Sequence, residues 1–209
     1  MLTLASAGGT IDGANSILIN TQYDFVQVTS DNTNWYITGG KTVQSFGGTT
    51  LFVSNDSYVN QIAPTINYGN SLSLKTIGTT GSASNSLILF DLSAIPSSSV
   101  IHKAVLNVWA NTINTSGTVN YYLITSGWAE SAVTWNTTPA VGSLIGTVAT
   151  GTSAPSLIQL DITTTVQGWI NGTITNYGIE IQGVGSTNIL LRSKESNSGG
   201  GNMAYITIF

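Results

Sequence analysis

Residues 127–139 read Gly127-Trp128-Ala129-Glu130-Ser131-Ala132-Val133-Thr134-Trp135-Asn136-Thr137-Thr138-Pro139. Val133 and Trp135 alternate with polar residues, which predicts a half-buried strand that ends before Pro139. Trp128 precedes a turn of small residues, so we expect its ring to fold back over that strand. Because a tryptophan can bury about 150–250 Å², we predict that this stretch seeds a hydrophobic core around which the other strands gather.

The chain carries few charges for its length. Charged residues make up 7% of its 209 residues, against about a quarter in typical soluble domains, and the formal net charge is −4. With five Lys and Arg residues in all, it lacks the basic surface that nucleic acid binding requires. A surface built from Thr, Ser, Asn and Gly favours an extracellular or virion protein, glycan contacts or subunit packing over a cytosolic enzyme.

Several kinds of site and segment are missing from the sequence. The chain has no cysteine, so it can form neither a disulfide nor a zinc–thiolate site. No apolar run reaches the length of a membrane-spanning helix, and residues 1–7 are too short and lack the basic start of a signal peptide. We therefore expect no membrane insertion and no targeting segment.

Few residues could support catalysis. His102 is the only histidine, and no serine lies in a Gly-x-Ser-x-Gly motif, which argues against a Ser–His–Asp triad. We expect Asp91 to cap the turn that follows it and Asp161 to cap a helix. We expect Glu130 to accept backbone donors in the turn after Trp128. The sequence therefore predicts no catalytic residue and no enzyme activity.

Residues 1–46 form a distinct N-terminal element. They contain short apolar or alternating stretches at residues 17–19, 25–28 and 35–37, separated by turn signals. Three strands in so few residues cannot bury a core of their own. They could form a meander of the main domain, but we favour docking or oligomerisation, because strands with few charges need a partner surface. The residues predicted to make this contact are Phe25, Val28, Trp35 and Ile37.

The same element resembles a small β-element of bacteriophage tail fibres and related virion proteins. The stretches that carry the resemblance are Gly9-Thr10-Ile11-Asp12-Gly13, Tyr23-Asp24-Phe25-Val26-Gln27-Val28 and Ser30-Asp31-Asn32-Thr33-Asn34-Trp35-Tyr36-Ile37. The chain departs from the pattern at Asn32, where glycine is common, although asparagine also tolerates positive φ. The resemblance implies a homotrimer on the virion surface that contacts other virion proteins of the capsid or tail.

Residues 47–55 contain a glycine pair and predict a linker, and residues 56–209 predict the main domain. Many short apolar or alternating stretches follow one another there, with Gly, Asn and Ser turns between them. Residues 161–172 instead space their apolar residues at helical intervals. We therefore predict an all-β fold: an antiparallel, jelly-roll-like β-sandwich with one short helix across its open end, after the small N-terminal β-element.

The main domain resembles the DNRLRE-domain family, whose fold is also seen in carbohydrate-binding module family 96. The resemblance runs in order through residues 56–208. Its motifs include Asp56-Ser57-Tyr58-Val59, Asn67-Tyr68-Gly69, Trp128 to Pro139, Val166-Gln167-Gly168-Trp169 and Ser193-Lys194-Glu195. Members occur in secreted polysaccharide-active enzymes, adhesins and surface proteins, and some bind acidic glycans such as alginate. The family often carries an arginine where this chain has residues 87–90, and with only five basic residues an acidic-glycan site is poorly supported.

Two kinds of binding residue can be proposed from sequence. Asp56 begins the domain and Glu195 lies near its end, so a sandwich could bring them together near Asn67 as a calcium site. The alternative is a hydrogen-bonded carboxylate that ties the terminal strands together. Tyr121 and Tyr122 are adjacent in a predicted strand and point to opposite faces, so one of them is a candidate for glycan contact. No other cofactor is expected.

Three functions remain open at this point. The first, which we favour, is a non-enzymatic bacteriophage virion protein, a homotrimeric capsid decoration or cement protein that displays the sandwich. The second is a tail-fibre tip or receptor-binding module that binds host surface glycans. The third is an enzyme, which would require converging carboxylates or a histidine site.

Overall fold

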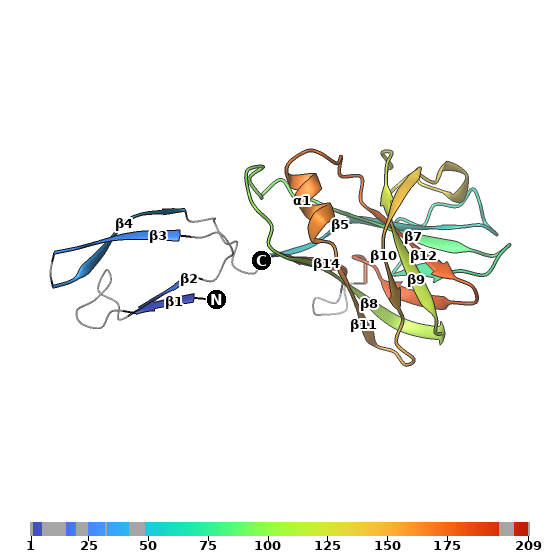
Figure 1. Cartoon of the computed structure of the whole chain (residues 1–209). Coiled ribbons are helices and arrows are strands. Elements are labelled where there is room, and N and C mark those ends of the chain that lie inside the picture. Colours follow the sequence, from blue (N-terminus) through green and yellow to red (C-terminus); the bar gives the residue numbers. More distant parts are fainter. Residues whose placement is uncertain are drawn as a thin grey trace. The chain divides into compact units, whose positions relative to one another are not determined.

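The computed structural model describes residues 2–5, 16–19, 25–31, 33–41, 49–196 and 203–208. The chain divides into two compact units, Met1–Ser45 (unit 1) and Phe46–Phe209 (unit 2). Unit 1 contains two antiparallel pairs, β1 (Leu2–Ala5) with β2 (Ser16–Ile19) and β3 (Phe25–Ser30) with β4 (Trp35–Lys41) (Figure 1). The strands expected in residues 17–19, 25–28 and 35–37 are therefore present.

The turn between β3 and β4 is fixed by an aspartate. Asp31 Oδ1 accepts the backbone N–H groups of Thr33 and Asn34, at 2.8 and 2.7 Å. Across the hairpin, Val28 pairs with Ile37 and Ser30 with Trp35. Phe25, Val28, Trp35 and Ile37, the predicted oligomerisation residues, lie in these strands, but their side chains are outside the described part of the chain.

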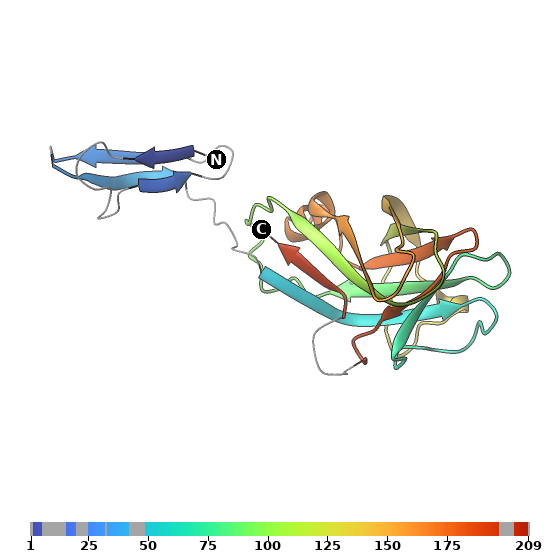
Figure 2. The same cartoon turned by 90° about the horizontal axis from the view of Figure 1, so that it is seen from below.

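Unit 2 is an antiparallel sandwich whose strands form one continuous order, β10-β9-β12-β7-β5-β14-β8-β13-β6, with β11 beside β8. Figure 2 shows β14 between β5 and β8. β6 also pairs with β7 through Ile77 and Ser84, which joins the end of the order back to its middle. The strands are β5 (Thr49–Asn60), β6 (Ser73–Ile77), β7 (Ser84–Phe90), β8 (Ala104–Thr115), β9 (Thr118–Ile124), β10 (Val141–Ala149), β11 (Ser156–Asp161), β12 (Ile179–Val184), β13 (Asn188–Arg192) and β14 (Tyr205–Ile208). The predicted all-β sandwich is confirmed.

The main core lies between the layers and follows the two-residue period of the strands. Ile88 and Phe90 on β7, Tyr121 on β9 and Ile179 and Ile181 on β12 all point into it and are buried. Their neighbours in sequence therefore face the opposite side of the same strands, which we call the outer face of β7, β12 and β9.

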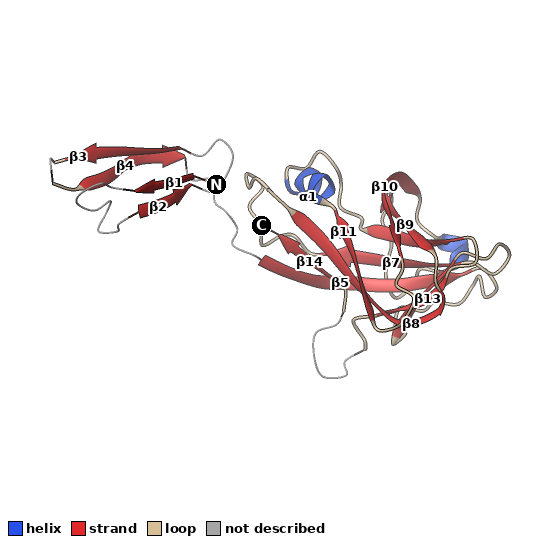
Figure 3. Cartoon of the chain, turned by 60° about the horizontal axis from the view of Figure 1, so that its bottom comes forward, coloured by secondary structure: helices blue, strands red, loops and turns tan. Residues whose placement is uncertain are grey.

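The predicted helix is α1 (Thr163–Ile170), which covers one end of the sandwich (Figure 1). It buries Val166, Trp169 and Ile170 against the main core. The N-cap position is Ile162 and not Asp161 as expected, although Asp161, one residue earlier, still accepts the Thr163 N–H of the first turn through its Oδ1 at 3.0 Å. Apart from α1, the only helix among the described residues is a 3-10 turn at Trp135–Thr137 (Figure 3).

The linker expected at residues 47–55 is contradicted over most of its length. Residues 49–55 form the first half of β5, where Leu51 pairs with Ile206 of β14 and Val53 with Phe90 of β7. The alternation of Leu51 and Val53 with polar residues is a strand pattern, and Val53 is buried in the main core. The glycine pair that suggested a linker precedes this strand in the sequence.

The strand expected at Val133–Trp135 is also wrong. The Val133 N–H donates to the carbonyl of Ala129 at 2.9 Å, and the Val133 carbonyl accepts Asn67 Nδ2 at 2.7 Å. Because the backbone N–H and carbonyl of Val133 make these hydrogen bonds, they do not pair with a neighbouring strand. The chain continues into the 3-10 helix at Trp135–Thr137. Val133 is nevertheless buried, with Trp128 and Trp135 packed against it. This cluster is a second, smaller one on the outer face and not the seed of the main core.

Candidate functional site

A groove lies on the outer face, between the sheet and the loop of residues 126–140. Its volume is about 320 Å³. The sheet contributes Asn85 from β7 and Glu180 and Gln182 from β12; the loop and the start of β10 contribute Trp135, Thr138, Pro139 and Val141. We call these seven residues the outer groove.

Glu180 is the charged group of the outer groove, and it is 1% exposed. Its Oε1 accepts hydrogen bonds from Asn85 Nδ2 at 2.8 Å and from Gln182 Nε2 at 2.7 Å. Its Oε2 is buried and has no hydrogen-bond partner among the described residues. Burial raises the pKa of this carboxyl, while the two amide hydrogen bonds act in the opposite direction.

The neighbours of Glu180 follow from strand register. Glu180 pairs with Leu87 of β7 on one side and with Tyr122 of β9 on the other. Leu87 belongs to the small cluster under Trp135, so the aromatic ring and the carboxylate share one surface. Tyr122 is half-buried, and its hydroxyl accepts Asn120 Nδ2 at 3.3 Å.

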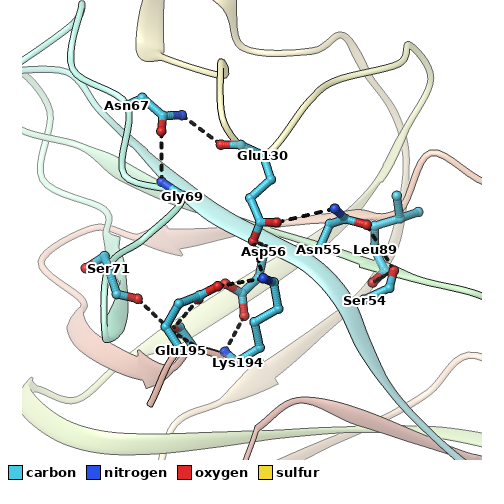
Figure 4. A network of polar contacts seen from close by, with 11 residues as sticks. Ser54, Asn55, Asp56, Asn67, Gly69, Ser71, Leu89, Glu130, Lys194 and Glu195 are labelled. Carbon is cyan, nitrogen blue, oxygen red and sulfur yellow. Dashed lines mark hydrogen bonds and ion pairs between the residues drawn. The ribbon is translucent and has the colours of Figure 1, made fainter. Parts of the chain in front are cut away.

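A second polar site, the carboxylate cluster, consists of Asp56, Glu130, Lys194 and Glu195 (Figure 4). One carboxylate oxygen from each acidic residue lies within 4.8 Å of the other two. Lys194 Nζ is 3.0 Å from Glu130 Oε1 and 2.6 Å from Glu195 Oε1. The hydrogen bond to Glu195 raises the pKa of Lys194 although burial lowers it, so this side chain remains an ammonium.

The carboxylate cluster attaches the loop that carries Trp135 to the sheet. Glu130 Oε1 accepts the backbone N–H of Asp56 at 3.1 Å, and Glu130 Oε2 accepts Asn55 Nδ2 at 3.3 Å. Lys194 N donates to Asp56 Oδ2 at 2.7 Å. Glu130 therefore accepts donors from β5, and not those of its own turn as the sequence suggested.

Residues 48–207 match the family model of carbohydrate-binding module family 96. The chain belongs to carbohydrate-binding module family 96. No curated protein matches it. The part of the prediction that named a carbohydrate-binding module is confirmed, while the DNRLRE resemblance and the bacteriophage resemblance of residues 1–46 stay resemblances.

The two tyrosines predicted as glycan contacts lie on opposite faces of β9 in this family 96 module. Tyr121 points into the main core, is 1% exposed, and has a hydroxyl pKa raised by burial. It cannot contact a glycan without unfolding the sheet, so that candidate is wrong. Tyr122 lies on the outer face beside Glu180 and remains a candidate.

The residues proposed as calcium ligands are only partly brought together. Asp56 and Glu195 meet in the carboxylate cluster, but Asn67 is used elsewhere: its Nδ2 donates to the carbonyls of Glu130 and Val133, and its Oδ1 accepts the N–H of Gly69. The three carboxylates are ligands of the type that calcium prefers. A calcium ion would have to displace the Lys194 ammonium, which the sequence reasoning did not foresee. Calcium binding stays a prediction.

The titratable residues considered for catalysis lie in structural positions. His102 is exposed in a turn. Asp91 Oδ1 accepts the Ser93 N–H at 2.9 Å, so its predicted turn cap is confirmed. The hydrogen bonds from Ser93 lower the pKa of Asp91. Within the described part of this module, no helix is long and apolar enough to cross a membrane.

Proposed function

We propose that this chain is a non-catalytic glycan-binding protein and that the glycan occupies the outer groove. The observation that carries the proposal is the joint lining of this groove by Trp135 and by the polar residues of the sheet, Asn85, Glu180 and Gln182. Membership of a carbohydrate-binding module family supports the same function.

The lining suits a sugar because pyranose rings have an apolar C–H face and an edge of hydroxyls. Trp135 and Val141 offer apolar surface, and Asn85, Glu180 and Gln182 offer hydrogen bonds that orient the ring. The loop that holds Trp135 is fixed by the carboxylate cluster and by the Trp128 Nε1 hydrogen bond to the Tyr177 carbonyl at 2.9 Å. Because the loop is already held in place, less conformational entropy is lost when a ligand binds.

Replacement of Trp135 tests the proposed groove. We expect Trp135→Ala to weaken glycan binding at least about tenfold, equivalent to about 1.4 kcal/mol, because the ring surface is lost. A glycan array would identify the ligand and isothermal titration would give the affinity, with thermal unfolding to confirm that each variant folds. Trp109→Ala is the matched control, because Trp109 is a half-buried tryptophan on β8 outside the groove. Equal losses in both variants, or no loss in Trp135→Ala, would contradict the groove assignment.

We also propose that the protein is displayed on a bacteriophage virion as a homotrimer, through unit 1. Each sheet described in unit 1 has two strands, and isolated two-stranded sheets are marginal in water without a partner surface. Capsid decoration is the arrangement we favour, with the tail-fibre tip as the alternative.

Light scattering of the full chain tests this arrangement. We expect a solution mass three times that of one chain, and a monomer when residues 1–46 are deleted, because β5 and its sheet begin after that deletion. A monomeric full chain, or a trimer that survives the deletion, would count against docking through unit 1.

A further inference from the structure

We infer that Lys194 and Asn67 are positioning residues of the outer groove, because they fix the part of the 126–140 loop that places Trp135 in the lining. Neither residue lines the groove itself, so each acts through the loop. This inference rests on the proposed function, because it names the residues that hold the binding surface of the same groove in shape.

The first argument is the position of the Lys194 ammonium between two carboxylates. Its Nζ lies 3.0 Å from Glu130 Oε1 and 2.6 Å from Glu195 Oε1, and among the described residues it is the only ion-pair partner of either. Without this ammonium, Glu130 and Glu195 would face each other as like charges, which repel. Glu130 belongs to the 126–140 loop, so we expect this repulsion to move the loop away from β5.

The second argument is the amide of Asn67, which joins the two ends of the turn from Glu130 to Val133. Its Nδ2 donates to the carbonyl of Glu130 at 2.8 Å and to the carbonyl of Val133 at 2.7 Å. Its Oδ1 accepts the N–H of Gly69 at 3.2 Å, which fixes the plane of the amide. Gly69 is packed so closely on Glu130 that an added Cβ would lie 2.9 Å from the Glu130 carbonyl carbon. A displacement of Glu130 is therefore passed on to Val133.

The third argument is the packing of Trp135 on this turn. Val133 is 3% exposed, and Trp135 packs against the cluster that contains it. Trp135 begins the 3-10 helix two residues later, and the N–H of Asn136 donates to the Pro64 carbonyl at 3.0 Å. Pro64 lies in the loop of residues 61–72 that also carries Asn67. The place of Trp135 in the groove therefore depends on the same contacts that hold the turn.

Hydrogen–deuterium exchange of the backbone amides of residues 130–137 tests the inference, with EDTA present so that no calcium ion can replace the ammonium. Lys194→Met removes the charge but keeps an unbranched side chain, and we expect exchange about fivefold faster. Lys194→Arg keeps the charge and should restore the natural rates. Asn67→Ala removes both bonds to the turn and should accelerate exchange at least as much. Lys103→Met is the matched control, because Lys103 is an exposed lysine that is absent from the carboxylate cluster.

Titration with the oligosaccharide that binds most strongly on the glycan array links the loop to binding. We expect Lys194→Met to weaken binding about fivefold, and to weaken it less when Trp135→Ala is already present, because residues that act through one another give non-additive losses.

Natural exchange rates in both Lys194→Met and Asn67→Ala would overturn the inference while the proposed function stands. Equal acceleration in Lys103→Met, or losses of Lys194→Met and Trp135→Ala that add fully, would do the same. If no glycan on the array binds, or if binding is indifferent to Trp135, the proposed function itself fails, and the exchange rates still decide whether Lys194 and Asn67 fix the loop.

Discussion

Gly178→Ala is expected to lower the free energy of unfolding of unit 2 by about 4 kcal/mol or more. Gly178 has φ +91°, where an L-residue costs about 1–2 kcal/mol. An added Cβ would also overlap the Ile88 carbonyl oxygen and lie 3.1 Å from its carbonyl carbon. Because the obstacle is backbone in β7, no side-chain rotation can relieve it, and β12 must move away from β7.

This movement reaches the outer groove as well. Asn176 Oδ1 accepts the Gly178 N–H at 3.1 Å and Asn176 Nδ2 donates to the Phe90 carbonyl at 2.9 Å, so the entry to β12 is tied closely to β7. Glu180 follows two residues later and depends on this spacing for its bond to Asn85. We therefore expect any folded fraction of the variant to bind glycan weakly.

Gly185→Ala is the matched control for this experiment. Gly185 has φ +61° and nothing within 4 Å of the added Cβ, so only the conformational cost of about 1 kcal/mol applies. Chemical denaturation of both variants gives the two free energies of unfolding. Similar losses at Gly178 and Gly185 would show that β7 and β12 tolerate separation, contrary to the packing described here.

Strands and helices that follow from short-range residue patterns can be predicted from the sequence. Alternation of apolar and polar residues marks most strands of unit 2, and helical spacing after Asp161 marks α1. The same period places Tyr121 and Tyr122 on opposite faces, although it cannot say which face is the core. The packing of the two layers decides this, and it places Tyr121 in the main core.

The features that sequence reasoning missed depend on distant partners. Val133 fails to form a strand because Asn67, from another loop, binds its carbonyl. Lys194 lies two residues after the end of β13 and contacts Glu130, which is distant in sequence. The outer groove combines residues from β7, β12, the 126–140 loop and the start of β10. Strand register places the sheet residues, and the hydrogen bonds of Glu130 and Trp128 place the loop. The one signal available was Glu180 itself, a charged residue between two isoleucines in a strand.

The second large effect concerns pH. Burial raises the pKa of Asp56 to about 8 from its usual 3.8; the Lys194 N–H bond acts in the opposite direction, and the negative charges of Glu195 and Glu130 raise it further. Burial also favours a raised pKa for Glu195, but hydrogen bonds from Lys194 and Ser193 outweigh it and lower that pKa. The pair therefore holds one proton, on Asp56, whose Oδ1 otherwise has no hydrogen-bond partner among the described residues.

The raised pKa of Asp56 determines whether stability rises or falls with pH. Between about pH 4 and pH 8 the folded chain keeps a proton that the unfolded chain has released, so the folded state binds more protons. The stabilisation from this proton is complete below the unfolded pKa and is lost as the pH rises through the folded one. We expect the free energy of unfolding to fall by on the order of 4 kcal/mol between about pH 5 and pH 8.

Asp56→Asn isolates this contribution. Its amide can donate to Glu195 as the protonated carboxyl does, so the variant should be close to the natural chain in stability near pH 5 and more stable near pH 8. Glu180, whose pKa burial also raises, leaves a smaller slope of the same sign. Asp91→Asn is the control, because the lowered pKa of Asp91 affects stability only at more acidic pH. Urea unfolding across the pH series measures all three chains. A slope for Asp56→Asn equal to that of the natural chain would mean that Asp56 is already ionised in the fold, with Lys194 neutralising the cluster on its own.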